Sequence, residues 1–400
     1  MDSLTQITLG AAVGEVVLGK KIGNRALLWG AVGGTIPDLD VLANFVLSEV
    51  DALAFHRGIS HSIFFSIVGG FIIGWLVDSF YKSMYYKNLA FGGWAVLTAG
   101  VLILINVILK KQSIHLIAFG LSLLFYIYLI SRLAKSYLFR ERQLPDASTR
   151  DWQWLFFWSI FTHPLLDAFT TYGTQLFQPF SDYRVAFNTI SVADPLYTVP
   201  FLSCVIICSF YHRTNIKRRW INYAGIGISS FYLLFTVFNK MHIDRTFESS
   251  LQAQSIQYDR FMSTPTILNN ILWQGIAQKD DKYYMGSYSL FDSKDISFVE
   301  IDRNDEMIAK ASEDRTIRIL EWFTDGYYNV IRRKDGNIQI NDLRYGSLSP
   351  DYQSENSYVF RFPLRENPDG SYDVINGDGG PPEGTEQEMM KNLIERIKGN

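Results

Sequence analysis

The sequence predicts a polytopic α-helical membrane domain followed by a small soluble α+β domain. Residues 1–240 carry long apolar stretches with few charges, whereas charged residues and turn formers return after residue 245. The apolar stretches have about the length that crosses a ~30 Å hydrocarbon core. Two polar strings, HRGISH and HPLLD, interrupt them, and ionisable groups in such surroundings usually serve a function. We therefore expect a membrane domain at 1–240 and a soluble domain at 245–400.

The membrane domain should contain about six full spans plus two short N-terminal apolar helices. Two shorter apolar pieces, 4–19 and 25–37, precede the spans and could be tilted spans or a re-entrant hairpin buried among the other helices. The expected full spans are the segments 60–80, 89–109, 114–134, 152–171, 195–211 and 220–238.

The soluble half combines short alternating runs with one helical pattern. We expect a helix over Asp305–Phe323 and a mobile Gly/Pro-rich segment at 377–387 before a short terminal helix. A net charge of −3 without a basic stripe on this half argues against a nucleic-acid partner. The expected strands are Ile271–Gln278, Tyr283–Phe291, Tyr328–Arg333 and Tyr358–Pro363.

The distribution of lysine and arginine predicts the orientation in the membrane. The loops 20–25, 81–88, 132–150 and 212–219 together hold fourteen such residues, against six on the opposite side. Because the cytoplasmic side collects the excess, those loops should be cytoplasmic. The polar strings and the soluble domain then lie on the extracytoplasmic, or periplasmic, face of the cytoplasmic (inner) membrane.

The HPLLD string offers the first pair of candidate metal ligands. His163 and Asp167 are four residues apart, so on a helix they share one face and can bind one cation at about 2 Å each. In a soluble helix such a pair would more often form a surface hydrogen bond. Here the apolar surroundings hold little water to satisfy either group, which favours a metal.

The HRGISH string adds two histidines and an arginine. His56 and His61 would diverge on a continuous helix, but Gly58 allows His56 to lie in a loop and His61 in a first helical turn capped by Ser60. The planar fork of Arg57 suits a phosphate or carboxylate of a substrate. An arginine facing lipid headgroups is the alternative interpretation.

Three aspartates extend the candidate metal site. Asp38 and Asp40 form a DxD pair that, in an extended turn, would point to one side and hold one metal or bridge two; an Asx turn is the alternative. Asp194 precedes Pro195 and is a candidate ligand, a helix N-cap, or both. Asp40 and Arg57 are the candidates for direct catalytic roles, as general base and as substrate-binding cation.

Four further side chains are candidates for supporting roles. Gln6 and Glu15 lie in the first apolar segment and could be accessory ligands or could orient a ligating histidine. Thr171 and Tyr172 follow the HPLLD string and could line a substrate entrance.

Five strings in order resemble the YdjM-like (also YfhP-like) family of predicted membrane-bound metal-dependent hydrolases. The strings are MDSLTQITLGAAVGE, TIPDLD, HRGISHS, HPLLDAFTTYGTQLFQPFSD and ADPLYTVP, and the resemblance covers roughly residues 1–240. Many members of that family have a Thr-His pair where this chain has Thr5 and Gln6, so the first ligand here could differ. The resemblance implies a metal and hydrolysis without fixing a substrate.

Together these features predict a hydrolase that uses one or two divalent ions, with zinc as the first candidate. Its substrate would be a membrane lipid or a lipid-linked or membrane-proximal phosphoester, since a cationic, metal-bearing pocket would lie beside lipid headgroups. Two other classes remain open. The same residues could form the transit site of a metal or proton transporter, or the membrane part could be an inactive scaffold that presents the soluble domain.

Overall fold

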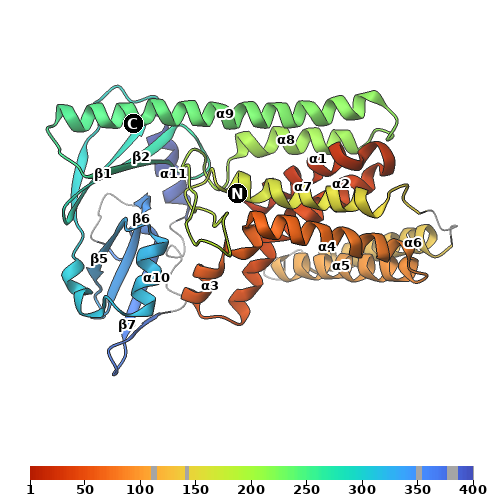
Figure 1. The fold of residues 1–400 in the computed structure, drawn as a ribbon, viewed down its shortest axis with the longest axis horizontal. Helices are drawn as coiled ribbons and strands as arrows, with labels where there is room; N and C mark the ends of the chain where they lie inside the picture. The colour runs from red at the N-terminus through yellow and green to blue at the C-terminus, as the bar shows by residue number, and fades with distance from the viewer. Residues whose placement is uncertain (110–114, 140–143, 348–353, 376–385, 400) are drawn as a thin grey trace. The chain divides into compact units, whose positions relative to one another are not determined.

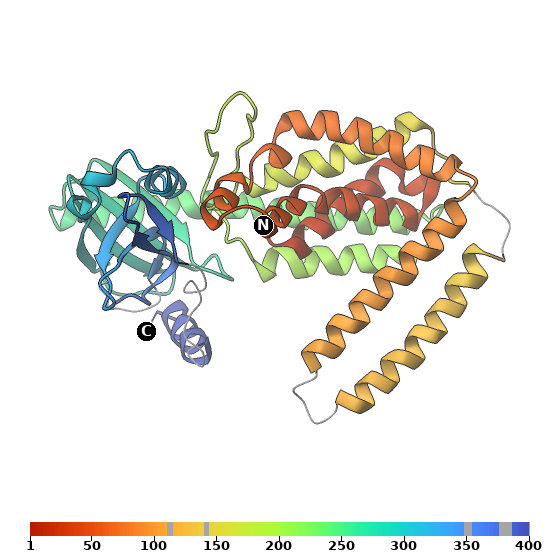
Figure 2. The ribbon, with the colours of Figure 1, turned by 90° about the horizontal axis from the view of Figure 1, so that it is seen from below.

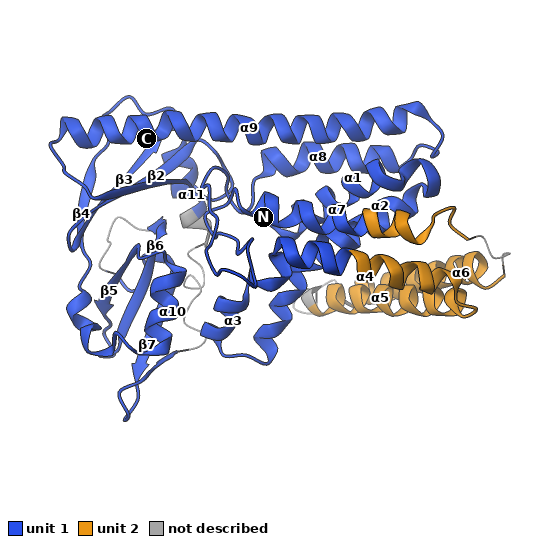
Figure 3. Cartoon of the chain, in the orientation of Figure 1, with its two compact units in different colours: residues 1–70, 155–400 blue, residues 71–154 orange. Residues whose placement is uncertain are grey.

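The computed structural model describes residues 1–109, 115–139, 144–347, 354–375 and 386–399. The chain divides into two compact units, one of residues 1–70 with 155–400 and one of residues 71–154 (Figure 3). Lys110, Lys111, Arg140 and Arg142, which entered the charge count, lie outside the described residues.

Every apolar segment expected from the sequence contains a helix (Figure 1). Among the described residues, four helices are long and apolar enough to cross a membrane, at Ile63–Lys82, Tyr86–Val107, Leu116–Tyr137 and Ile216–Ala253. A fifth span results if the helix Asn24–Thr35 and the 3-10 helix Pro37–Phe45 form one span bent by 49°. The expected count of six full spans is therefore not confirmed. The helices are α1 (Ser3–Ile22), α2 (Asn24–Thr35), α3 (Glu49–Phe55), α4 (Ile63–Lys82), α5 (Tyr86–Leu109), α6 (His115–Tyr137), α7 (Thr149–Asp167), α8 (Pro195–Ser209) and α9 (Ile216–Ala253).

Helices α1 and α2 form a hairpin whose backbones touch at glycines. A Cβ atom at Gly10 would lie 2.3 Å from the carbonyl oxygen of Gly30, and one at Gly34 would lie 2.5 Å from that of Gln6. Small residues four apart allow such close approach between apolar helices. The hairpin matters for function because Gln6 and Gly34 both contact the candidate site described below.

The second unit contains a helical hairpin made by α5 and α6, which lie side by side (Figure 2). The Asn106 side-chain amide donates to the Ser122 hydroxyl at 2.8 Å, and the Trp94 indole donates to the Tyr137 hydroxyl at 3.1 Å. These bonds satisfy polar groups that lipid could not satisfy.

Helix α9 runs along α8 and continues into the C-terminal domain, where it contacts the first sheet (Figure 1). In its last turns Phe247 is fully buried and packs with Trp273 and Ile296 of that domain. The domain boundary expected at 240–245 therefore falls inside a 38-residue helix. A continuous helix of this kind ties the two domains together more firmly than a loop would.

The C-terminal domain contains two four-stranded antiparallel sheets, each with its strands in sequence order. The first sheet consists of β1 (Arg260–Pro265), β2 (Leu272–Lys279), β3 (Lys282–Ser289) and β4 (Phe298–Asp302). The second consists of β5 (Tyr328–Arg332), β6 (Ile338–Ser347), β7 (Tyr358–Glu366) and β8 (Tyr372–Val374).

Two helices accompany these sheets, α10 (Arg315–Phe323) and α11 (Glu386–Ile397). The apolar face of α10 packs on the second sheet, with Ile317 and Phe323 fully buried. The prediction of a helix from Asp305 onward was wrong in its first half. The Asp314 carboxylate accepts a hydrogen bond from the Ile317 amide at 3.1 Å and so begins the helix at Arg315, after two short 3-10 turns.

All four expected strands are present as β2, β3, β5 and β7, whereas β1, β4, β6 and β8 were not predicted. Strand β6 was missed because polar residues, including Asn341, Asp342 and Arg344, are buried within it and hide its alternation. Helix α11 agrees with the expected terminal helix. Residues 377–385 of the segment expected to be mobile lie outside the described residues.

The hairpin contact predicts that Gly30→Ala destabilises the membrane domain by about 1–3 kcal/mol, because the new Cβ would lie 2.2 Å from the Gly10 carbonyl oxygen. The measurement is the apparent melting temperature of the purified protein in detergent. Gly227→Ala in α9 is the matched control, since a Cβ there meets no described atom within 4 Å. It should leave the melting temperature unchanged or raise it. Equal effects of the two substitutions would contradict the close contact.

Candidate metal centre

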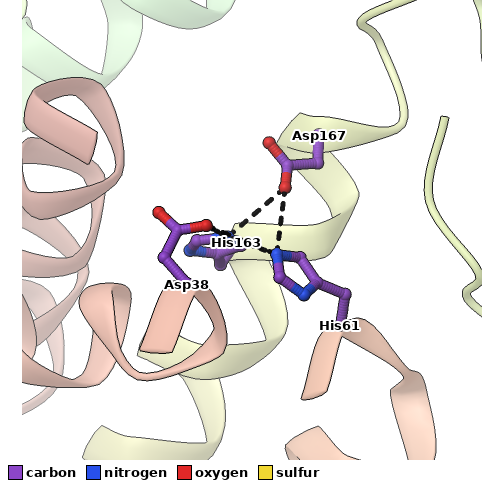
Figure 4. A group of neighbouring side chains, drawn as sticks. All are labelled: Asp38, His61, His163 and Asp167. Atoms are coloured by element: carbon purple, nitrogen blue, oxygen red, sulfur yellow. Dashed lines mark hydrogen bonds and ion pairs between the residues drawn. The ribbon is translucent and has the colours of Figure 1, made fainter. Parts of the chain in front are cut away.

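Four side chains that are distant in sequence meet at one point: Asp38, His61, His163 and Asp167 (Figure 4). Asp38 lies in the 3-10 helix Pro37–Phe45, His61 ends the 3-10 turn Ile59–His61, and the other two lie on the last turns of α7. Each offers one ligand atom, and these atoms all lie within 4.8 Å of one another. Both histidines and Asp167 are fully buried.

Five of the six distances between these atoms are close to those around a tetrahedral ion, and the sixth, between the two carboxylate oxygens, is within 4.8 Å. The two Nε2 atoms are 3.1 Å apart, and the Asp38 Oδ1 atom lies 3.5 Å from Nε2 of His61 and 3.3 Å from Nε2 of His163. Asp167 Oδ2 lies 3.5 and 3.3 Å from the same two nitrogens. Metal–ligand bonds of about 2.0–2.1 Å in tetrahedral geometry separate neighbouring ligands by about 3.3 Å. The side chains are therefore spaced as a bound ion requires.

The outer nitrogens of both imidazoles are held by acceptors. His163 Nδ1 donates to the carbonyl oxygen of Gly34 at 2.6 Å, and His61 Nδ1 faces the Asp40 carboxylate at 3.2 Å. A neutral imidazole that donates from Nδ1 carries a lone pair on Nε2. Two lone pairs and two carboxylate oxygens then face one another in a buried space. Only a cation or added protons can compensate this arrangement.

The two oxygens of Asp167 have different surroundings. Oδ1 accepts a hydrogen bond from the Gln6 side-chain amide at 2.9 Å, lies 3.4 Å from the Arg57 guanidinium and contacts the Met1 amino group. Oδ2 is buried, faces both histidines and has no hydrogen-bond partner among the described residues. An oxygen without a hydrogen-bond partner is what a metal ligand should have, because the ion takes the place of the hydrogen-bond donor. Gln6 therefore lies beside the four-residue cluster and orients one of its members.

Asp40 lies beside the cluster and contacts both histidines of the HRGISH string. Its Oδ1 is 2.9 Å from Nδ1 of His56, and its Oδ2 accepts a hydrogen bond from the Ser60 hydroxyl at 2.9 Å and faces His61. The ring of His56 is 5.6 Å from that of His61, so His56 is adjacent to the cluster but not in it. A carboxylate behind a ligating imidazole fixes its orientation and raises its basicity.

Arg57 is buried against Asp167 and is only 4% exposed. Its NH1 donates to the Thr170 hydroxyl at 3.0 Å, and its guanidinium carbon lies 4.8 Å from the centre of the Tyr172 ring. Its backbone has a φ of 38°, a conformation that non-glycine residues seldom adopt. Its Nε has no hydrogen-bond partner in the described part of the chain.

Asp194 and Glu15 have structural partners away from the four-residue cluster. The Asp194 carboxylate caps α8 by accepting from the Leu196 amide at 2.9 Å, and it also accepts from the Tyr232 hydroxyl at 2.9 Å. Glu15 forms a buried two-point ion pair with Arg218, with N–O distances of 2.7 and 2.6 Å. The structure thus brings neither carboxylate into the cluster.

Thr171 and Tyr172 lie where the loop after α7 meets the C-terminal domain. The Thr171 hydroxyl is hydrogen-bonded to that of Thr264 in β1, and the Tyr172 ring packs edge-on against Phe323 of α10 at 5.3 Å. The Tyr172 ring also contacts the ring of His56, and the two ring centres are 5.2 Å apart. The loop therefore connects the cluster's surroundings to the C-terminal domain.

Two groups at the site were not anticipated from the sequence. The first is the Gly34 carbonyl, a backbone group. The repeated small residues of GAAVG (10–14) and GAVGG (30–34) could have indicated the close helix contact that places it there. Arg184 lies near Tyr172 and had been counted only as a loop charge. Burial, and the charge of Arg344, lower the pKa of the Arg184 guanidinium to about 10.

Comparison with known proteins identifies a family. The family model described as YdjM inner membrane protein matches residues 1–243, which include all four residues of the cluster. No curated protein and no solved structure matches the chain.

The geometry predicts which histidines are needed for metal retention. His163→Ala and His61→Ala should lose bound metal, because each removes a nitrogen that faces the cluster. His56→Ala should retain metal with an affinity lowered by about 10–100-fold, since it removes only a partner of Asp40. Elemental analysis of the purified proteins after dialysis tests this, with the exposed His212→Ala as the matched control. Metal loss in His56→Ala equal to that in His163→Ala would contradict the assignment.

Proposed function

We propose that this chain, which belongs to the YdjM inner membrane protein family, is a metal-dependent hydrolase with one divalent ion held by Asp38, His61, His163 and Asp167. The observation that carries the proposal is the convergence of two imidazole lone pairs and two carboxylate oxygens in a buried space. We propose zinc as the ion, because imidazole and carboxylate donors in tetrahedral array are typical of zinc sites.

When bound, the ion would polarise the scissile group and lower the pKa of a water molecule toward neutrality, for which it would have to accept that water or the substrate in addition to the four side chains. The chain's own residues hold the ligands in position. Asp40 and the Gly34 carbonyl fix the two imidazoles, and Gln6 with Arg57 holds Oδ1 of Asp167 so that Oδ2 faces inward. Because both oxygens of Asp40 have partners, we now assign it a positioning role instead of that of general base.

His56 is a candidate for proton transfer to or from a substrate. Its side chain is 25% exposed, whereas those of the two ligating histidines are fully buried. Asp40 holds its Nδ1 at 2.9 Å, which leaves Nε2 as the nitrogen that can reach a substrate. Groups oriented in this way serve as general acids or bases.

We propose that the site opens at the extracytoplasmic face and acts on a membrane-proximal phosphoester. The four ligands come from the 3-10 helix after α2, from the turn before α4 and from the end of α7, which supports a position near one membrane face. The excess of lysine and arginine in the opposite loops supports the extracytoplasmic side. Arg57, adjacent to the cluster, favours an anionic substrate.

The same geometry gives less support to a transporter. A transit path for ions or protons needs titratable groups at successive depths. Glu15, in the first apolar segment, would be the acidic residue of such a path, and its carboxylate accepts hydrogen bonds from Nε and NH2 of the Arg218 guanidinium. An acid neutralised in this way is poorly suited to exchange protons or cations.

Turnover assays test the proposed hydrolysis. Wild-type protein in detergent or in vesicles should cleave members of a panel of phosphate monoesters, diesters and phospholipids, and a chelator should abolish this cleavage until Zn²⁺ is restored. His163→Ala removes a ligand atom and Asp38→Asn removes the negative charge of another ligand, so both should reduce kcat/KM to background. His212→Ala should retain wild-type turnover. Hydrolysis that persists with chelator, or in His163→Ala, would overturn the proposal.

A further inference from the structure

The C-terminal domain meets the surroundings of the cluster at Tyr172. Arg184, in the loop between α7 and α8, has its guanidinium carbon 4.9 Å from the centre of the Tyr172 ring. The same guanidinium lies 5.0 Å from the ring of Trp322 and 4.5 Å from that of Phe323, both on α10. Its NH1 donates to the Phe323 carbonyl at 2.9 Å, and its NH2 donates to the Tyr172 carbonyl.

The Tyr172 ring also contacts Arg57, which lies beside the four-residue cluster. The Arg57 guanidinium carbon lies 4.8 Å from the ring centre, and the NH1 atom of Arg57 lies 3.4 Å from Oδ1 of Asp167. Tyr172 and Arg57 are 9% and 4% exposed, so water does not separate these groups. A continuous chain of contacts therefore runs from α10 through Tyr172 and Arg57 to a candidate metal ligand.

The arrangement is unusual for Arg184 because its charge lacks an anionic partner in the described part of the chain. No described carboxylate lies within 4 Å of its guanidinium, whereas Arg344 nearby is paired with Asp342 at 2.6 Å. The guanidinium relies instead on ring faces and backbone carbonyls, which hold a cation well only when they surround it closely. Arg184 therefore fixes the positions of Tyr172 and α10 relative to each other.

We infer that the C-terminal domain helps to position the ligands of the metal centre. Arg184, Trp322 and Phe323 hold Tyr172 in place, and Tyr172 holds Arg57 against Asp167. Arg184, Trp322 and Tyr172 are positioning residues that act through Arg57. The inference rests on the metal site of the proposed function but does not depend on hydrolysis or on the substrate.

Binding of Co²⁺ by the full-length protein, followed by its visible spectrum, tests this inference without a substrate. Arg184→Gln, Trp322→Leu and Tyr172→Leu should each weaken Co²⁺ binding by about tenfold, as loss of an outer positioning group does. Tyr172→Phe keeps the ring and should restore binding to within about twofold of wild type.

Arg260→Gln is the matched control for Arg184→Gln. The Arg260 guanidinium also lies over a tyrosine ring, 3.9 Å from the centre of Tyr327, and donates to the Asp325 carbonyl at 2.8 Å. It stands in the same domain but contacts none of the cluster residues among those described. Arg260→Gln should leave Co²⁺ affinity unchanged, and equal weakening by both substitutions would overturn the inference by indicating general destabilisation.

The Arg57→Gln background tests whether the effect passes through Arg57. In that background, Arg184→Gln should change the Co²⁺ dissociation constant by less than about twofold, because the coupling between the two residues has been removed. A full tenfold effect that persists without Arg57, or no effect with Arg57 present, overturns the inference. A wild-type protein that binds no Co²⁺ overturns the proposed metal centre and this inference with it.

Discussion

The structure depends most on one constraint, which is that two imidazole nitrogens and two carboxylate oxygens face one another and need a cation or added protons between them. His61, His163 and Asp167 are fully buried, and Asp38 is partly exposed. Three of the four atoms are oriented by a partner behind them: the Gly34 carbonyl for His163, Asp40 for His61, and Gln6 with Arg57 for Asp167. Burying such groups is costly unless a cation or hydrogen bonds compensate them. The number of residues that hold this geometry indicates that the cluster is an assembled site and not a chance meeting of polar side chains.

The surrounding fold follows from the need to keep these partners fixed. Glycines let α1 and α2 touch, and this contact brings Gln6 of one helix and the Gly34 carbonyl of the other to the same end of α7. Helix α9 continues without interruption into the C-terminal domain, and Asn239 on it donates to Asn270 of that domain at 2.7 Å. The C-terminal domain is therefore held beside the loop that carries Tyr172. Through the Tyr172 ring it can influence the position of Arg57.

Part of this site could be predicted from the sequence. The four-residue spacing of His163 and Asp167 predicted their common face, which the structure confirms. The membrane side inferred from the charge count stays a prediction. The sequence did not distinguish Asp38 from Asp40, because an extended DxD would point both to one side. In the observed 3-10 helix, two residues differ by about 240° around the axis, so Asp38 faces the cluster and Asp40 faces His56. A turn at Arg57, with its positive φ, precedes His61, which enters the cluster. Such choices depend on backbone winding and tertiary contacts, which residue spacing does not encode.

The most direct test of the central claim is X-ray absorption at the metal edge of the zinc-loaded, full-length protein. Four nitrogen or oxygen neighbours at about 2.0–2.1 Å, with outer scattering from two imidazoles, are the predicted result. A sulfur neighbour at about 2.3 Å, scattering from fewer than two imidazoles, or an unchanged spectrum in His163→Ala would contradict an ion held by Asp38, His61, His163 and Asp167.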